Sequence, residues 1–372
     1  MIYADHAATT PLSSAAYVAM QPWLQEKYGN PSTLYSLARE PRKAIAAARE
    51  TIAQCIGAKA EEIYFTSGGT EADNWALIGT VFRKADRHGR MITSNIEHHA
   101  ILNTGNFLER MGYEVVYLPA DKHGVLNADL LENHLTDDTL LVSIMFANNE
   151  IGTVQPIKEL AAKTHALNSL FHTDAVQAVG HIPINVGTMN VDMLSASAHK
   201  FNGPKGIGFL YIRDGVSIES FLHGGAQEKG MRAGTENVAG IVGMAVALRE
   251  HCEHLDQESC YLKSLADFLL TKLYATGLDF IVNGSDDRIP GSLSISFAKV
   301  DGEMLLHRLD LLGTAVATGS ACDSKGKALS HVIRAIGVPE TYARGTIRIS
   351  LGMDNDKRQV EEIVRQLCTI LR

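Results

Sequence analysis

The sequence has no long apolar run, because none approaches the roughly 20 residues that a helix needs to span a bilayer. Its first residues also lack the basic segment and apolar core of a secretory signal, so we expect no export. Basic residues are not in excess, since 34 Lys and Arg stand against 42 Asp and Glu and give a net charge of −8. These absences argue against a membrane protein and against nucleic acid as the main ligand.

Cysteine is scarce as well. The five cysteines of the 372 residues are Cys55, Cys252, Cys260, Cys322 and Cys368. A scattered, odd-numbered set forms no disulfide framework and suits a reducing compartment, which predicts a cytoplasmic location. Cys252 and Cys260 lie near His251 and His254, but this spacing matches no common zinc pattern, so we predict no metal site.

Short apolar runs alternate with helical patterns between about residues 60 and 215. Unbroken apolar strands that alternate with helices predict a mostly parallel sheet with helices on both faces. Residues 237–276 have the pattern of one long helix that links two lobes, and the remainder is of mixed α+β type. We therefore predict an α/β protein with a large domain of residues 13–255. Residues 1–12 and 256–372 would form a smaller α+β domain.

Two charged side chains follow apolar runs of the predicted sheet. Lys200 lies in SAHKFNGPKG, after a small-residue strand, and Asp174 follows the apolar pair at 170–171. Such a lysine can form a Schiff base with an aldehyde cofactor, and such an aspartate can pair with a protonated pyridine nitrogen. A lone lysine in this position is usually an ordinary surface residue. The polar clusters around it favour pyridoxal phosphate as the cofactor.

Further polar clusters follow other strands, at the edge where ligands bind in parallel sheets. TSGGTE at 66–71 places Gly69 and Thr70 at a predicted helix start, where free N–H groups can bind a phosphate. A plain glycine turn with a threonine cap explains these residues equally well. Ser197 and His199 flank Lys200 closely enough to help hold the phosphate.

Three other polar residues are candidates with open alternatives. His98 could stack on a cofactor ring and move protons, or belong to a zinc site or a pair of surface histidines. Asn149 could bond a ring hydroxyl or a substrate carboxylate, although loop asparagines more often form turns. Thr235 lies in a glycine-rich stretch at 223–237, which is either a second phosphate contact or a flexible connector.

Cys322 differs from the other cysteines in its surroundings, because its predicted loop, TGSACDSKGK, consists mostly of small and polar residues. Structural cysteines usually lie on apolar faces, as the patterns around Cys55 and Cys368 indicate. Lys325 and Lys327 would favour the thiolate. We therefore predict a chemical role for Cys322.

In this order, the clusters resemble those of the class V pyridoxal phosphate enzymes of fold type I, and more narrowly the NifS/IscS cysteine desulfurases. The resemblance covers nearly the whole chain. Its stretches are YADHAATT (3–10), YGNPS (28–32), FTSGGTE (65–71), EH (97–98), NNEIG (148–152), HTDAVQ (172–177), SAHK (197–200), GPKG (203–206), RAGTEN (232–237) and GSAC (319–322).

The resemblance implies a role for each candidate residue. Lys200 would bind the cofactor covalently, Asp174 would pair with its pyridine nitrogen, and His98 would stack on the ring as acid and base. Gln177 would contact the ring hydroxyl. The residues implied to hold the phosphate are Gly69, Thr70, Ser197, His199 and, from the other subunit of a homodimer, Thr235. The residues implied to grip the substrate carboxylate are Asn149, which also borders the cofactor, and Arg348.

The implied reaction converts L-cysteine to L-alanine and leaves a persulfide on Cys322, whose sulfur passes to an acceptor protein. Iron–sulfur cluster assembly and tRNA or DNA thiolation are the implied destinations. The alternatives are a selenocysteine lyase, another class V enzyme such as a transaminase, which needs no loop cysteine, and a non-catalytic scaffold with the same fold. A nucleotide-binding protein is disfavoured because the glycine loops match neither of the common nucleotide motifs.

Overall fold

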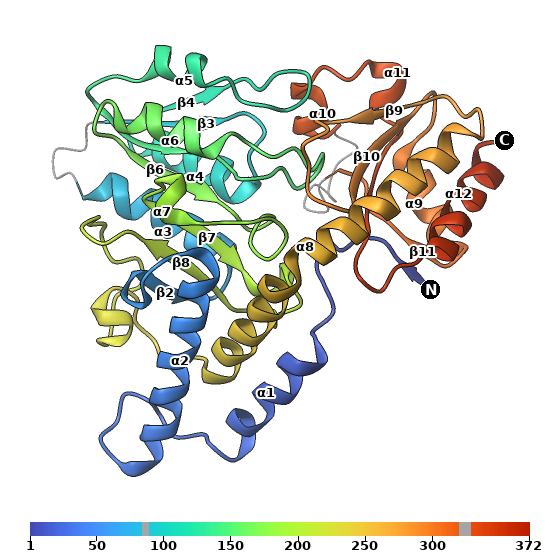
Figure 1. Cartoon of the computed structure of the whole chain (residues 1–372). Coiled ribbons are helices and arrows are strands. Elements are labelled where there is room, and N and C mark those ends of the chain that lie inside the picture. The colour runs from blue at the N-terminus through green and yellow to red at the C-terminus, as the bar shows by residue number, and fades with distance from the viewer. Residues whose placement is uncertain (84–88, 320–328) are drawn as a thin grey trace.

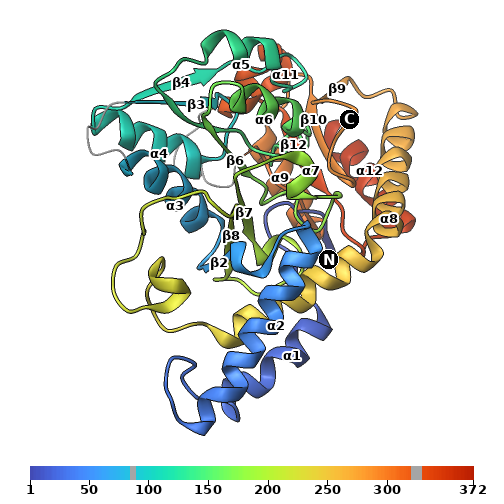
Figure 2. The ribbon, with the colours of Figure 1, turned by 60° about the vertical axis from the view of Figure 1, so that its left-hand side comes forward.

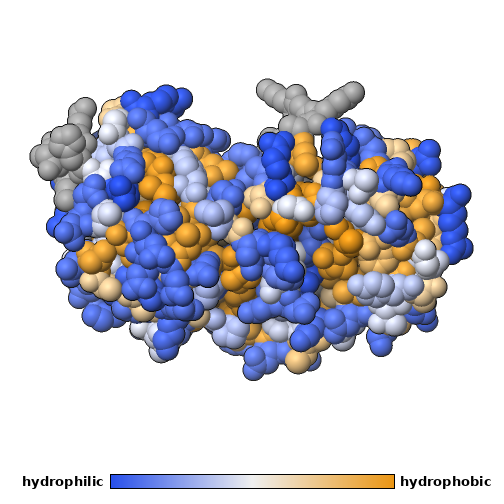
Figure 3. Space-filling model, turned by 90° about the horizontal axis from the view of Figure 1, so that it is seen from above, coloured by the Kyte–Doolittle hydropathy of each residue, from blue (hydrophilic) through white to orange (hydrophobic). Residues whose placement is uncertain are grey.

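A computed structural model describes residues 1–83, 89–319 and 329–372. The chain forms two lobes, joined by the long helix α8 (Val238–Tyr274), as Figure 1 shows. Among the described residues, no helix is both long and apolar enough to cross a membrane. Hydrophilic side chains cover much of the face seen in Figure 3, with smaller apolar patches between them.

The larger lobe is built on a seven-stranded sheet in the order β2-β8-β7-β6-β5-β3-β4. The strands are β2 (Ile63–Thr66), β3 (Arg90–Ser94), β4 (Glu114–Leu118), β5 (Thr139–Ser143), β6 (Leu170–Asp174), β7 (Met193–Ser197) and β8 (Gly208–Ile212). Neighbouring strands from β4 to β7 are parallel, and β8 runs antiparallel to both β2 and β7. The prediction of a mostly parallel sheet is therefore confirmed.

Helices cover both faces of this sheet. They are α2 (Arg39–Ile56), α3 (Gly69–Phe82), α4 (His99–Arg110), α5 (Ala128–His134), α6 (Ile157–His165) and α7 (Val186–Met189). Helix α1 (Ser14–Gln25) packs against α8 instead. Figure 2 shows α3 and α4 on one side of the strands and α6 and α7 on the other.

Strand side chains alternate between two hydrophobic cores, because successive residues of a strand point to opposite faces. Ile92 and Val142 pack in one core with residues of α2, α5, α6 and the first half of α8. Their neighbours Met91 and Leu141 pack in the other core, with α3 and α4. A sheet buried on both faces requires the continuous apolar runs that the sequence contains.

The smaller lobe contains a three-stranded antiparallel sheet in the order β12-β10-β9 and a parallel pair, β1 with β11. Its strands are β1 (Ile2–Tyr3), β9 (Phe280–Asn283), β10 (Ser292–Phe297), β11 (Thr314–Ala315) and β12 (Thr346–Ser350). Its helices are α9 (Gly302–Leu311), α10 (His331–Ala335), α11 (Glu340–Ala343) and α12 (Lys357–Leu371).

Helix α8 contributes to the cores of both lobes. Met244 and Leu248 belong to a core of the large lobe, whereas Leu265 and Leu269 belong to the core of the small lobe. Helix α8 therefore passes from the core of the large lobe to that of the small lobe between Leu248 and Leu265, in the region of the predicted domain boundary. The exact division at residue 255 remains a prediction.

Candidate active site

A cavity of about 530 Å³ lies at the edge of the large sheet where β3, β6 and β7 end. Parallel strands bring the residues that follow them to this common edge. The predicted residues in its wall are Gly69, Thr70, His98, Asn149, Asp174, Gln177, Ser197, His199, Lys200 and Arg348. The structure thus brings these predicted residues together in one place, although the role of each stays a prediction.

Lys200 ends the short 3₁₀ helix η3 (Ala198–Lys200), directly after β7. Its Nζ donates to the backbone oxygens of Ala7 and Ala8, at 2.5 and 2.9 Å. These residues belong to the N-terminal segment, which follows β1 and lines the cavity at Ala7 and Ala8. The ammonium group is therefore held by carbonyl dipoles at the cavity wall.

Asp174 is the last residue of β6 and is only 5% exposed. Its Oδ1 accepts the N–H of Val176 at 3.0 Å. Burial raises the pKa of Asp174, while the charges of His98 and Lys200 and the bond from Val176 lower it in part. A cationic ring N–H placed against this carboxylate would relieve the cost of burying its charge. The chemistry of Asp174 thus fits a pyridinium nitrogen.

The N-terminus of α3 forms one wall of the cavity beside Ser197. The helix begins at Gly69, so the first N–H groups of α3 have no partners within the helix. A Cβ on Gly69 would come within 2.5 Å of Val176 Cγ2, so the close approach of helix and loop requires glycine there. Free N–H groups, Thr70 and Ser197 make this wall suitable for a phosphate.

His98 is the N-cap of α4, and its Nδ1 accepts the N–H of Ala100 at 3.1 Å. In the neutral ring the proton therefore lies on Nε2. Burial lowers the pKa of His98, the charge of Asp174 raises it, and that of Lys200 lowers it again. His98 thus enters the cavity wall as a neutral ring that can donate a hydrogen bond through Nε2.

Arg348 reaches the cavity from β12 of the small lobe and is 3% exposed. Its two terminal nitrogens donate to the backbone oxygen of Asn149 and to Oδ1 of Asp5, both at 2.6 Å. Among the residues that the structure describes, its buried Nε has no hydrogen-bond partner. Arg348 is therefore held in a fixed orientation and keeps further N–H donors for a ligand.

Sequence reasoning missed Asp73, which lines the same cavity and is 1% exposed. Burial, and then the charge of Asp174, raise the pKa of Asp73 well above its ordinary value, so its neutral form is favoured. Ser195 bonds both Asp73 and the ring of His172, whose pKa burial lowers to about 3. His172 Nε2 also lies 3.8 Å from Asp73 Oδ1, so Asp73 and His172 form a buried polar pair close to Asp174. Because Asp73 points inward from a helix face, its spacing in the sequence resembles that of a core residue.

The Glu71–Arg232 ion pair was also missed. Arg232 Nε and Nη2 donate to the two carboxylate oxygens of Glu71, at 2.8 and 3.1 Å. Glu71 also accepts the N–H of Ser67, at 2.8 Å. The pair ties the loop that contains Thr235 to the start of α3. Thr235 itself is exposed and lies outside the cavity wall.

Cys322 lies outside the described residues. The last described residue before it, Gly319, lies beside Glu150, because a Cβ on Gly319 would be 2.9 Å from Glu150 Oε2. Glu150 follows Asn149 of the cavity wall. The described flank of the cysteine loop therefore lies next to the cavity.

The family model for aminotransferase class-V matches residues 2–363. The chain belongs to this family. Class-V relatives, cysteine desulfurases among them, are pyridoxal phosphate enzymes. The class-V chain is 48% identical to the cysteine desulfurase IscS of Dictyoglomus turgidum, over 99% of this chain and 96% of that protein.

Two solved structures are also similar to this chain. A NifS-like protein superimposes with a TM-score of 0.94 at 38% identity, covering 100% of this chain and 99% of the other. SspA in complex with cysteine superimposes with a TM-score of 0.85 at 37% identity, covering 95% and 99% of the two chains. The predicted resemblance and the fold type I architecture are therefore confirmed.

Gly69→Ala should weaken the binding of pyridoxal phosphate about tenfold or more, because the new Cβ would push Val176 into the cavity wall. Absorbance titration of the apoprotein would measure the dissociation constant. The matched control is Gly187→Ala, at an exposed position of α7, where the nearest contact of the Cβ would be an ordinary 3.4 Å. Equal affinity of the two variants would contradict a close-fitting phosphate site at α3.

Glu97→Gln should remove a pH dependence of stability. Burial raises the pKa of Glu97 from 4.5 to about 8, despite bonds from Ser94 and Met145 that lower it. The folded state therefore holds a proton that the unfolded state releases between pH 4.5 and about 8, so this contribution to stability is lost as pH rises through that window. Urea unfolding should show that the stability of Glu97→Gln relative to the parent increases with pH. The exposed control is Glu50→Gln. If the difference in unfolding free energy between Glu97→Gln and the parent varied with pH no more than that of the control, the raised pKa of Glu97 would be contradicted.

Proposed function

We propose that the protein is a pyridoxal-phosphate-dependent cysteine desulfurase. It converts L-cysteine to L-alanine and transfers the sulfur to Cys322 as a persulfide. The observation that carries the proposal is one cavity with a lysine, a buried aspartate and a buried arginine in its wall: Lys200, Asp174 and Arg348. The similarity to IscS and to SspA in complex with cysteine supports L-cysteine as the substrate.

The residues of the cavity fit pyridoxal phosphate. When bound, this cofactor supplies an electron sink for the α-carbon of an amino acid. Lys200 would hold it covalently, Asp174 would keep its ring nitrogen protonated, and Gln177 would border its hydroxyl. The groups proposed to hold the phosphate are the N–H groups at Gly69 and Thr70 and the side chains of Thr70, Ser197 and His199.

Four residues act on the substrate. Arg348, oriented by Asp5, binds the carboxylate together with Asn149. Lys200 Nζ would be freed when the amine of the substrate takes its place, and it would then remove the α-proton. His98 would donate a proton through Nε2. Because burial and the ammonium of Lys200 both lower the pKa of His98, although the charge of Asp174 raises it, this ring is neutral and presents its Nε2–H as a donor toward the substrate.

Cys322 acts as the sulfur acceptor. Its thiolate attacks the substrate sulfur, so an S–S bond forms while the C–S bond breaks and the carbon keeps the electron pair. Protonation of that carbon gives L-alanine. The net change is cysteine plus a thiol to alanine plus a persulfide, which balances without an external oxidant.

The active protein is proposed to be a homodimer in which Thr235 of one subunit completes the phosphate site of the other. Its exposure outside the cavity of its own chain, and the Glu71–Arg232 pair that holds its loop near α3, support this arrangement. An acceptor protein, in iron–sulfur cluster assembly or in tRNA or DNA thiolation, receives the sulfur. A cytoplasmic location remains a prediction that depends on the few scattered cysteines.

Cys322→Ala should lower the release of alanine and sulfide from L-cysteine at least about a hundredfold, because no other thiol is expected to accept the sulfur. Cofactor absorbance should be unchanged. The matched control is Cys260→Ala, an exposed cysteine of α8. Turnover of Cys322→Ala at the parental rate would contradict the persulfide mechanism and favour another class-V reaction.

A further inference from the structure

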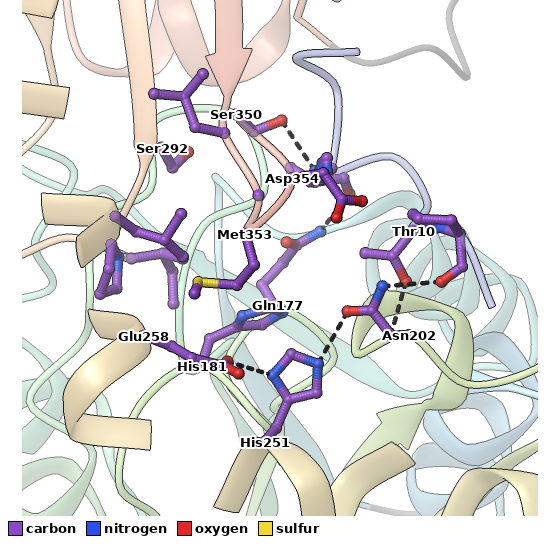
Figure 4. A pocket seen from close by; sticks show the side chains of 18 of the residues that line it. Thr10, Gln177, His181, Asn202, His251, Glu258, Ser292, Ser350, Met353 and Asp354 are labelled. Carbon is purple, nitrogen blue, oxygen red and sulfur yellow. Dashed lines mark hydrogen bonds and ion pairs between the residues drawn. The ribbon is translucent and has the colours of Figure 1, made fainter. Parts of the chain in front are cut away.

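A second cavity, of about 430 Å³, adjoins the first. It lies between the N-terminal segment, helix α8 and the loop after β12, as Figure 4 shows. The two cavities share Ala7, Asn149 and Gln177, so only a thin wall separates them. The polar side chains of the second cavity therefore lie directly behind the residues that surround Lys200.

Three backbone carbonyls around Lys200, those of His199, Lys200 and Asn202, each accept hydrogen bonds from another part of the chain. Thr10 donates to the carbonyl of His199 through both its N–H and its Oγ1, at 2.9 Å each. His181 Nε2 lies 2.8 Å from the carbonyl oxygen of Lys200. The carbonyl of Asn202 accepts the N–H of Ser13 at 2.8 Å. This loop is thus fixed from the N-terminal segment and from His181.

Asn202 is the strained point of this loop. Its φ of 58° lies in the left-handed region, which non-glycine residues adopt at a cost. Its N–H donates to Thr10 Oγ1 at 2.7 Å, and its Nδ2 donates to the carbonyl of Pro11 at 2.8 Å. Because the amide nitrogen faces a carbonyl, the orientation of the side chain is determined, and Oδ1 must point the other way.

Oδ1 of Asn202 faces Nε2 of His251, at 2.9 Å. The other ring nitrogen of His251 faces Oε2 of Glu258, at 2.8 Å. Amide and carboxylate oxygens only accept hydrogen bonds, so both ring nitrogens must carry protons to make both bonds. His251 is 8% exposed, and a buried imidazolium needs the partner charge that Glu258 supplies.

The other titratable groups near His251 are compatible with two protons on its ring. Burial, and then the charge of His251, lower the pKa of the adjacent His181 to about 4, so His181 is neutral and donates to the carbonyl of Lys200. Glu250 Oε2 accepts a hydrogen bond from Ser13 Oγ, at 2.8 Å. The remaining titratable groups of the cavity wall are His6, His254 and Asp354.

We propose that the His251–Glu258 ion pair positions Lys200. Its doubly protonated imidazole holds Asn202 in the left-handed conformation, and Asn202 in turn fixes the loop from which Lys200 enters the active site. His251 touches neither substrate nor cofactor in this assignment, so it is a positioning residue. The inference rests on the proposed function of Lys200 as the residue that binds the cofactor.

The first test asks whether His251 carries two protons. Solid-state ¹⁵N NMR of histidine-labelled apoprotein at neutral pH should show an imidazole with both nitrogens protonated. This signal should disappear in His251→Gln and persist in the matched control His254→Gln, which changes an exposed histidine on the same helix. A singly protonated His251 would overturn the proposal, whatever the enzyme does with cysteine.

The second test measures how fast the apoprotein captures pyridoxal phosphate, by stopped-flow absorbance without cysteine. His251→Gln and Glu258→Gln should slow capture about tenfold, because misplacement of a reacting group is costly. His254→Gln and Glu253→Gln, whose carboxylate is exposed, should capture at the parental rate. Capture by Glu258→Gln at the parental rate would overturn the proposal even if His251→Gln fails to fold. A parent protein that captures the cofactor but shows no desulfurase activity would count against the proposed function alone.

Discussion

Burial of the Asp174 carboxyl group at the end of β6 is the constraint on which the rest of the site depends. A carboxylate that has lost its water is stable only if cationic groups or hydrogen-bond donors replace it. The parallel strands supply these groups at one edge, where Val176, His98 and Lys200 all act on Asp174. The same edge begins α3 at Gly69, so an anion site and a cation site face one cavity.

The N-terminal segment connects this edge to the small lobe. Ala7 and Ala8 accept hydrogen bonds from Lys200, while Asp5 pairs with Arg348 of β12. The lysine from one lobe and the arginine from the other are thus held by residues only a few positions apart. A shift of the small lobe would therefore change both the reacting amine and the proposed carboxylate site.

The sequence allowed most of the large lobe to be predicted, because its buried strands are continuous apolar runs between helical patterns. The reversed direction of β8 was not predicted, since an antiparallel strand within the sheet has the same apolar pattern as its neighbours. Lys200 and Asp174 could be found because Asp174 ends strand β6 and Lys200 comes shortly after strand β7. Asp73 and the His251–Asn202 bond could not, because they depend on contacts between residues that are distant in sequence or on an inward helix face.

The central claim is that Lys200 holds the cofactor, and the same cavity contains a second lysine, Lys205, that could do so instead. Borohydride reduction of the protein after loading with pyridoxal phosphate would fix the cofactor to its lysine, and peptide mass spectrometry would locate it. The account predicts a pyridoxyl group on Lys200 in the parent and its absence in Lys200→Ala. A pyridoxyl group on Lys205 of the parent, or on no lysine at all, would contradict the account.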